Sequence, residues 1–300
     1  MMSDAGYLDA RAVEAAIKAA AKTAHTVDSS RQTGDLIRQA YYDRFLCRVF
    51  SETDAGEWVL KGGTGMLARV PNARRTLDAD LFKTGYDKGQ ALADLRRLAG
   101  VDLGDHFRFL YREHHAILVD DTQPYADGYR VTFDAYLGVK LVDTIKIDLS
   151  AGTRPTDDLD VADPANRLSL PRLVSYPYRL YPVANQIADK VCATIADYNG
   201  RPSSREKDLV DLVVIAVTQT VEATVLRQAI TSECAKRRLT VPDGFTIPAH
   251  WGPAYAKLAR NTPAEPYPIS VARDLVRAFI NPILAGEARG SWNPAAGVWS

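Results

Sequence analysis

EWVLKGGTGMLARVPNARRTLDADLF, residues 57 to 82, is the most informative part of this sequence. It begins with a short apolar run, typical of a strand, which ends in the glycines at 62, 63 and 65. Residues 64 to 70 then have the apolar spacing of a short helical segment, and residues 76 to 82 alternate with the period of a strand. The stretch therefore predicts strand, glycine turn, short helix and strand in succession.

The second of these strands carries a pair of aspartates. Side chains alternate along a strand, so Asp78 and Asp80 should share one face with Thr76, while Leu77 faces the core. Two neighbouring carboxylates repel one another, and a bridging divalent cation keeps both ionised. Since the ligands are oxygen atoms, Mg²⁺ or Mn²⁺ is the expected metal. A DxD pair alone is weak support, because chance and turn chemistry also produce it.

The glycine turn that precedes the aspartates suits a phosphate group. Gly63 permits close approach of the backbone, and Thr64 supplies a hydroxyl where the short helix begins. A plain tight turn after a strand is the alternative for the glycines alone. It does not explain why an apolar strand, a glycine–hydroxyl turn and a DxD strand follow one another.

A third carboxylate lies further along the chain, in DTIKIDLS. Asp148 falls on the strand face opposite Ile145 and Ile147. In two-metal chemistry such a residue acts as a metal ligand or as the base for an attacking hydroxyl. The alternatives are that Asp148 is an ordinary surface residue, or that the third carboxylate is Asp143, Asp134 or Asp121.

Periodicity elsewhere predicts a mixed α/β fold of the α+β type. Helices are expected at 8–24 and 33–50, strands at 106–118, 128–137 and 139–150 with a tight turn at Gly138, and helices again at 182–198, 204–217, 221–236 and 270–285. We expect residues 1–165 to hold the N-terminal helices and the sheet. Residues 166–300 are expected to form a mainly helical domain that completes a groove.

Composition excludes several classes of protein. Lysine plus arginine and aspartate plus glutamate both count 37 in 300 residues, so no net charge attracts nucleic acid or anionic membrane, and any such contact needs a local patch. The three cysteines are widely spaced, which argues against zinc and disulfide frameworks. Neither a signal peptide nor a membrane span is predicted, and we expect a cytoplasmic protein.

GGT followed by RRTLDADLF resembles the GS-x-DxD signature of polymerase-β-like nucleotidyltransferases, and in particular the AbiEii/MenT toxins. In that family a lysine-bearing helix and a helix with an R/K-D-x-x-D-L pattern follow the sheet; QIADKVCAT and SREKDLVDLVV match them here. SWNPAAGVW matches a closing WxP…W segment. The resemblance covers most of residues 55 to 300. Thr64 departs from the usual serine but keeps its hydroxyl.

The resemblance implies roles for two further residues. Lys190 would contact the triphosphate of a nucleoside triphosphate, and Asp211 would orient this lysine or touch the nucleotide. Asp208 is a second possible site residue. Without the resemblance, Lys190 would be a solvent-facing lysine, and Asp211 would form an ordinary intrahelical ion pair with Lys207. The expected catalytic residues are thus Asp78, Asp80, Asp148, Lys190 and Asp211.

The resemblance also implies a toxin of a toxin–antitoxin pair, which adds nucleotides from NTP to the 3′ end of tRNA, blocks translation and is neutralised by a cognate antitoxin. A basic rim could hold the RNA by its phosphates: Arg69, Arg74, Arg75, Arg201 and Arg205. Phosphorylation of Thr76 would add negative charge beside the metal and silence the site. The alternatives are nucleotidyl transfer to a protein or small molecule, and a non-catalytic partner-binding protein.

Overall fold

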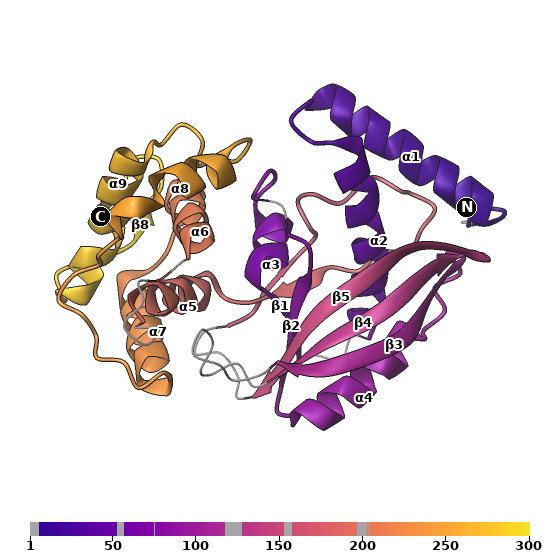
Figure 1. The fold of residues 1–300 in the computed structure, drawn as a ribbon, viewed down its shortest axis with the longest axis horizontal. Helices are drawn as coiled ribbons and strands as arrows, with labels where there is room; N and C mark the ends of the chain where they lie inside the picture. Colours follow the sequence, from indigo (N-terminus) through magenta and orange to yellow (C-terminus); the bar gives the residue numbers. More distant parts are fainter. Residues whose placement is uncertain are drawn as a thin grey trace.

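The computed structural model describes residues 6–52, 57–74, 76–117, 128–152, 158–196, 203 and 205–300. Figure 1 shows two lobes side by side: a sheet with its covering helices, and a group of helices formed by the C-terminal part of the chain. Two hydrophobic cores correspond to these lobes. The predicted mixed α/β fold, with N-terminal helices and a helical C-terminal portion, is confirmed.

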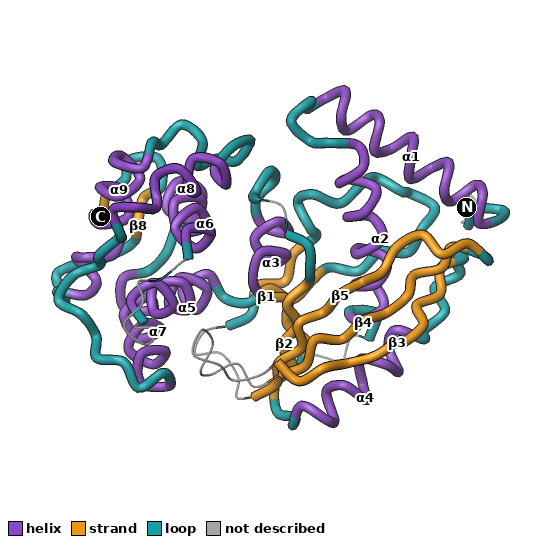
Figure 2. Tube along the Cα trace, viewed as in Figure 1, coloured by secondary structure: helices purple, strands orange, loops and turns teal. Residues whose placement is uncertain are grey.

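The sheet of the first lobe is mixed, with seven strands among the described residues. Its order is β3 (Phe107–Ile117), β4 (Gly128–Leu137), β5 (Lys140–Gly152), β2 (Ala79–Thr84), β1 (Trp58–Lys61), β7 (Tyr178–Leu180) and β6 (Asp160–Ala162). Figure 2 labels the strands from β3 to β1. The β2–β5 and β1–β7 pairs are parallel, and the other pairs are antiparallel. After β5 the chain passes β2 and β1 to form β6 and β7 at the far edge of the sheet, where β7 pairs with β1, which brings together residues that are far apart in sequence.

Helices cover one face of this sheet. Helix α2 (Thr33–Val49) is buried along its second half, and its Phe45 packs edge-on against Phe109 of β3. Helix α1 (Ala10–Val27) lies against α2. Helix α4 (Lys88–Ala99), which the periodicity did not predict, packs on β5 and α2 and begins with a capping box formed by Asp87 and Gln90.

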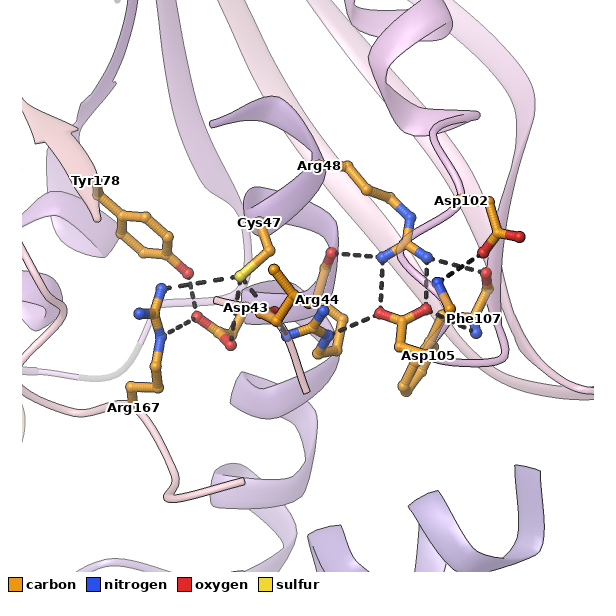
Figure 3. Close-up of polar contacts among 11 residues, drawn as sticks. Asp43, Arg44, Cys47, Arg48, Asp102, Asp105, Phe107, Arg167 and Tyr178 are labelled. Carbon is orange, nitrogen blue, oxygen red and sulfur yellow. Dashed lines mark hydrogen bonds and ion pairs between the residues drawn. The ribbon is translucent and has the colours of Figure 1, made fainter. Parts of the chain in front are cut away.

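Helix α2 also carries a buried network of charged side chains (Figure 3). The carboxylate of Asp105, which is 0 % exposed, accepts hydrogen bonds from Arg48 at 2.6 and 3.0 Å and from Arg44 at 2.8 Å. Directly before Arg44 in α2, Asp43 accepts a hydrogen bond from Arg167 Nε at 2.8 Å and another from the Tyr178 hydroxyl. The network fixes α2 to the segment before β3 and to the segment that leads into β7.

The second lobe is helical. It contains α5 (Val183–Ile195), α6 (Glu206–Thr218), α7 (Ala223–Lys236), a 3₁₀ turn (Ala249–Trp251), α8 (Gly252–Ala259), α9 (Ile269–Leu284) and the short pair β8 (Trp292–Asn293) and β9 (Val298–Trp299). Trp251 and Trp292 are fully buried in its core. None of the helices in the described ranges is long and apolar enough to cross a membrane.

Helix α3 (Gly62–Arg69) connects the two lobes. Its Ala68 belongs to the first core, whereas Met66, together with Val70 just after the helix, belongs to the second. The first core continues through residues 168–180, because β7 pairs with β1 in the sheet. Packing therefore divides after Leu180, later than the boundary expected at 165/166.

Candidate active site

The register of the sheet brings two of the expected carboxylates together. Asp80 of β2 is the neighbour of Asp148 in the parallel β2–β5 pair, and it faces Lys61 in the antiparallel β1–β2 pair. Asp148 lies on the sheet face that α2 and α4 leave uncovered, since Ile147 and Leu149 point into the core. Of the four candidates for the third carboxylate, three lie on described strands, and of these Asp148 is the one placed beside Asp80.

The rival aspartates are held elsewhere. Asp143 pairs with Arg38 of α2 at 3.2 Å, and Asp134 lies opposite Thr144, away from Asp80 along the sheet. Asp121 lies outside the described residues.

Asp78 is not part of the strand, which corrects one sequence expectation. Strand β2 begins at Ala79, and the Asp78 carbonyl oxygen accepts hydrogen bonds from the hydroxyls of Thr64 (2.8 Å) and Thr76 (3.0 Å). These hydroxyls take the place of a strand partner, so the strict alternation fails before residue 79. Leu77 is accordingly 58 % exposed rather than buried. The Thr76 hydroxyl also contacts the Asp78 carboxylate at 3.1 Å.

The glycine turn is shaped around Asp80. Gly62 has a φ of +58°, and a Cβ at this position would lie 1.9 Å from Asp80 Oδ2. Gly63 lies against Thr76 and Arg74, where a Cβ would come within 3.2 and 3.4 Å of their side chains. Close approach of the backbone to the carboxylate thus requires glycine at 62.

Gly62→Ala should therefore lower nucleotidyl transfer by about 10²-fold, because the added methyl group would displace the Asp80 carboxylate and small misplacements cost that much. Initial rates of transfer, measured at matched protein concentration, test this. Gly34→Ala, in a helical position with nothing within 4 Å, is the control and should keep full activity. A fully active Gly62→Ala protein would contradict the proposed position of Asp80.

The electrostatics at Asp80 suit a cation. Burial, and then the nearby charges of Asp78 and Asp148, raise the pKa of Asp80 to about 6. Ionised Asp80 is therefore destabilised by repulsion from neighbouring carboxylates, and a hard divalent cation would offset this repulsion. Asp78 and Asp80 fit such an ion as oxygen donors. In the part of the chain that the structure describes, however, no three His, Cys, Asp or Glu side chains are gathered as a metal cluster.

The third carboxylate is held by an arginine. Arg130 of β4 donates to Asp148 through Nε at 2.8 Å and Nη2 at 2.7 Å, and its Nη2 lies 4.0 Å from Asp78. Arg130 therefore neutralises part of the acidic cluster. A metal-binding role for Asp148 stays a prediction, since it requires this arginine to release the carboxylate.

Buried cations face the carboxylates from the second lobe. Lys190 of α5 donates to Asp211 at 2.6 Å and to Asp208 at 3.2 Å, both on α6. Burial alone would lower the pKa of Lys190, but the charges of Asp211 and Asp208 outweigh it and raise the pKa, so the amine stays protonated. Lys190 is buried rather than solvent-facing, and Asp211 pairs with it rather than with Lys207.

Arg74 joins the same group, in a place that sequence reasoning did not give it. Its Nε lies 3.0 Å from Asp211 Oδ1, and its Nη2 lies 3.1 Å from Asp211 Oδ2. Asp211, 0 % exposed, thus holds two cations next to Gly63. Lys61, which was not among the expected site residues, packs its ammonium over the Tyr181 ring at 4.4 Å and lies 3.6 Å from Asp189.

The described arginines of the expected basic rim already have partners within the protein. Arg69 binds Asp160 and donates to the Tyr181 carbonyl at 2.7 Å, which ties α3 to β6 and β7. Arg205 lies 3.7 Å from Asp208 and stays partly exposed. Arg75 and Arg201 lie outside the described residues.

A glycine turn against a carboxylate strand, closed by a buried lysine from a helical lobe, is an arrangement of nucleotidyltransferases. A family model described as "Nucleotidyl transferase AbiEii toxin, Type IV TA system" matches residues 44–295, and the chain belongs to this family. It is a nucleotidyltransferase toxin of a toxin–antitoxin system, and the family implies an NTP substrate and an antitoxin partner.

Two solved structures are similar to this chain. MenT4, a nucleotidyltransferase toxin from Mycobacterium tuberculosis H37Rv, is 14% identical, with 91% of this chain and 99% of that chain covered and a TM-score of 0.49. JHP933 from Helicobacter pylori is 15% identical, with 83% and 93% covered and a TM-score of 0.40. No curated protein matches the chain.

Proposed function

We propose that this toxin transfers nucleotides from an NTP to the 3′ end of tRNA in a metal-dependent reaction, and so blocks translation in the cytoplasm until its antitoxin binds. The observation that carries the proposal is the shared carboxylate of Asp211, which holds Lys190 and Arg74 beside the glycine turn and opposite Asp80. Two fixed cations next to a helix N-terminus suit a triphosphate.

The triphosphate would lie between α3 and the second lobe. Backbone N–H groups at Gly63 and Thr64 lie in the first turn of α3. Lys190 is held near them, because Asp211 binds both Lys190 and Arg74, and Arg74 lies beside Gly63. Asp211 would act as a positioning residue that keeps the lysine aimed at the phosphates. Gln186 supports this arrangement, because its side-chain amide donates to the Gly62 carbonyl at 2.9 Å.

Asp78 and Asp80 would hold Mg²⁺ or Mn²⁺, which when bound supplies charge neutralisation at the α-phosphate and the leaving group. Asp148 would accept the proton of the acceptor hydroxyl once Arg130 has released it. The 3′ oxygen then attacks the α-phosphorus, the bond from the α-phosphorus to the bridging oxygen breaks, and pyrophosphate leaves. Most of the rate enhancement would come from positioning and charge stabilisation.

The acceptor is tested by incubating the protein with each labelled NTP and either total tRNA or cell lysate depleted of RNA. Label should enter the tRNA in wild type and not in Asp80→Ala. Label in protein or small molecules alone would favour the alternative substrates, and absence of Mg²⁺-dependent NTP binding in calorimetry would favour the non-catalytic alternative.

The affinity for tRNA should fall by orders of magnitude between low and moderate salt, because the contacts are to phosphates. A tRNA affinity that does not change with salt would contradict phosphate contacts.

Regulation at Thr76 is a further part of the proposal. Its hydroxyl contacts both the carbonyl and the carboxylate of Asp78, so added negative charge would repel the metal ligand directly. Thr76→Glu should lose at least about 10²-fold in transfer rate, whereas Thr76→Ser, which keeps the hydroxyl, should stay close to wild type. Retained activity in the glutamate variant would rule out this form of control.

A further inference from the structure

A cavity of about 400 Å³ opens onto the site from one side, between α2, α3 and residues 257–262 of the second lobe. Its volume is within the range of about 300–1,000 Å³ that small-molecule pockets occupy. It meets the site at Thr64, Arg74, Thr76 and Asp78. Asp148 and Arg130 are not among its described lining residues, so the cavity lies on the triphosphate side of the aspartates and not on the acceptor side.

We propose that this cavity holds the nucleoside half of the incoming NTP and selects its base. The inference rests on the proposed function, because it takes the triphosphate to lie between Thr64 and Lys190. A nucleotide placed there, with its α-phosphate at Asp78, has its ribose and base directed away from Lys190. The cavity that begins at Thr64, Thr76 and Asp78 is the space open to them.

The walls of the cavity suit a flat, apolar ring with polar edges. Leu36 and Leu46 of α2, Leu67 of α3 and Leu168 supply apolar contacts, and the Tyr42 ring lies among them. Pockets of this composition bind small ligands through apolar area and use a few polar groups to fix orientation. The apolar walls thus suit a ring, and cationic side chains, among them Arg31, Arg38 and Arg260, also line the cavity.

Two carboxamides provide the polar groups. Asn166 is only 8 % exposed, and neither its side-chain amide nor that of Gln39 makes a hydrogen bond within the part of the chain that the structure describes. Both side chains line the cavity, so their amide groups are available to hydrogen-bond a ligand there. Each amide offers donors and an acceptor, the pattern needed for the edge of a base.

The floor of the cavity is preorganised by the buried network of α2. Asp43, Arg167 and Tyr178 all line the cavity, and the hydrogen bonds from Arg167 and Tyr178 to Asp43 fix all three side chains (Figure 3). Arg167 also donates to the Tyr176 carbonyl at 2.7 Å, which holds the segment that carries Asn166 and Leu168 against the floor. The walls are therefore held in place before a ligand arrives.

The test compares NTP binding with binding of tripolyphosphate, which lacks a nucleoside, by calorimetry in Mg²⁺ buffer. Gln39→Trp, which fills the cavity from its partly exposed side, should weaken binding of all four NTPs at least tenfold and leave tripolyphosphate binding unchanged. Gln39→Ala and Asn166→Ala should change the ratios among the four NTP affinities several-fold. Gln228→Trp, on the exposed face of α7 outside the cavity, is the matched control and should bind both as wild type does.

Two outcomes would overturn the inference: unchanged NTP affinity in Gln39→Trp, or an equal loss of NTP and tripolyphosphate affinity. Unchanged NTP affinity together with a raised KM for tRNA would assign the cavity to the acceptor. The proposed function fails on different results: a wild-type protein that neither binds nor transfers nucleotides, or one that labels protein or small molecules but not tRNA. Thermal unfolding of each variant shows that the fold is retained.

Discussion

Asp80→Ala should reduce nucleotidyl transfer by about 10³-fold or more while leaving the protein folded. Asp80 is the neighbour of both Asp148 in the sheet and Gly62 in the turn, so no other described carboxylate can replace it at this point. Loss of a group that organises charge at the reacting phosphate typically costs this much. Transfer of labelled nucleotide under single-turnover conditions is the measurement.

Stability provides a second, independent readout for the same variant. Burial and like charges raise the pKa of Asp80 to about 6, which means that its ionised form is unfavourable in the folded protein at neutral pH. Removing the carboxylate should therefore leave the Tm unchanged or raise it. Asp134→Ala, on the same sheet but away from the site, is the control and should retain activity. If Asp134→Ala were inactive and Asp80→Ala active, the metal site would have to be assigned to Asp134 instead of Asp80.

Asp105→Ala should destabilise the fold by about 3–5 kcal/mol, because it leaves the buried guanidinium groups of Arg44 and Arg48 without their shared carboxylate. Denaturant unfolding at neutral pH measures the loss. Asp102→Ala is the matched control: Asp102 is exposed and accepts only a local hydrogen bond from Gly104, so the change should stay within about 1 kcal/mol.

A variant that replaces the whole group tests the cause. Arg44→Met, Arg48→Met and Asp105→Leu together should recover much of the lost stability, since exchanging a complete buried ion group for apolar side chains is often neutral or stabilising. If the triple variant is as unstable as Asp105→Ala, the loss comes from packing and not from unpaired charge.

The same network predicts a dependence on acid. Burial alone would raise the pKa of Asp105, but its hydrogen bonds and charge pairing with Arg48 and Arg44 outweigh burial and hold the pKa below the ordinary 3.8. The stabilising contribution is therefore complete above about pH 4 and is lost as pH falls through the lowered pKa. The difference in unfolding free energy between wild type and Asp105→Asn should shrink below pH 4.

Local patterns predicted what depends on neighbours in sequence. Alternation and glycine placement predicted the strands up to residue 152 and a short helix after the glycines, although the helix begins at Gly62 with no separate turn, and β6 and β7 were not predicted. The positive φ of Gly138 confirms the predicted tight turn. Helix α4 was missed although its Asp87–Gln90 capping box can be read from the sequence. Leu77 was misplaced because two threonine hydroxyls remove Asp78 from the strand, and this depends on Thr64 lying opposite in space.

Contacts between distant segments could not be predicted in the same way. Arg74 belongs to an arginine pair that any surface could carry, and only its approach to Asp211 of α6 gives it a place at the site. Arg130 gave no signal at all, because its pairing with Asp148 depends on the register of β4 and β5. Lys190 was predicted by family resemblance, while its burial and its partners come from the packing of α5 on α6.

Helix α3 has a consequence for how the chain can be divided. It supplies Met66 to the interior of the helical lobe although it lies between two strands of the sheet lobe. A fragment beginning at residue 183 would lack that side chain and expose the surface it covers. Cleavage of the chain between the lobes should therefore yield two fragments that remain bound to each other. The helical lobe expressed alone should be less stable than the complex of the two fragments.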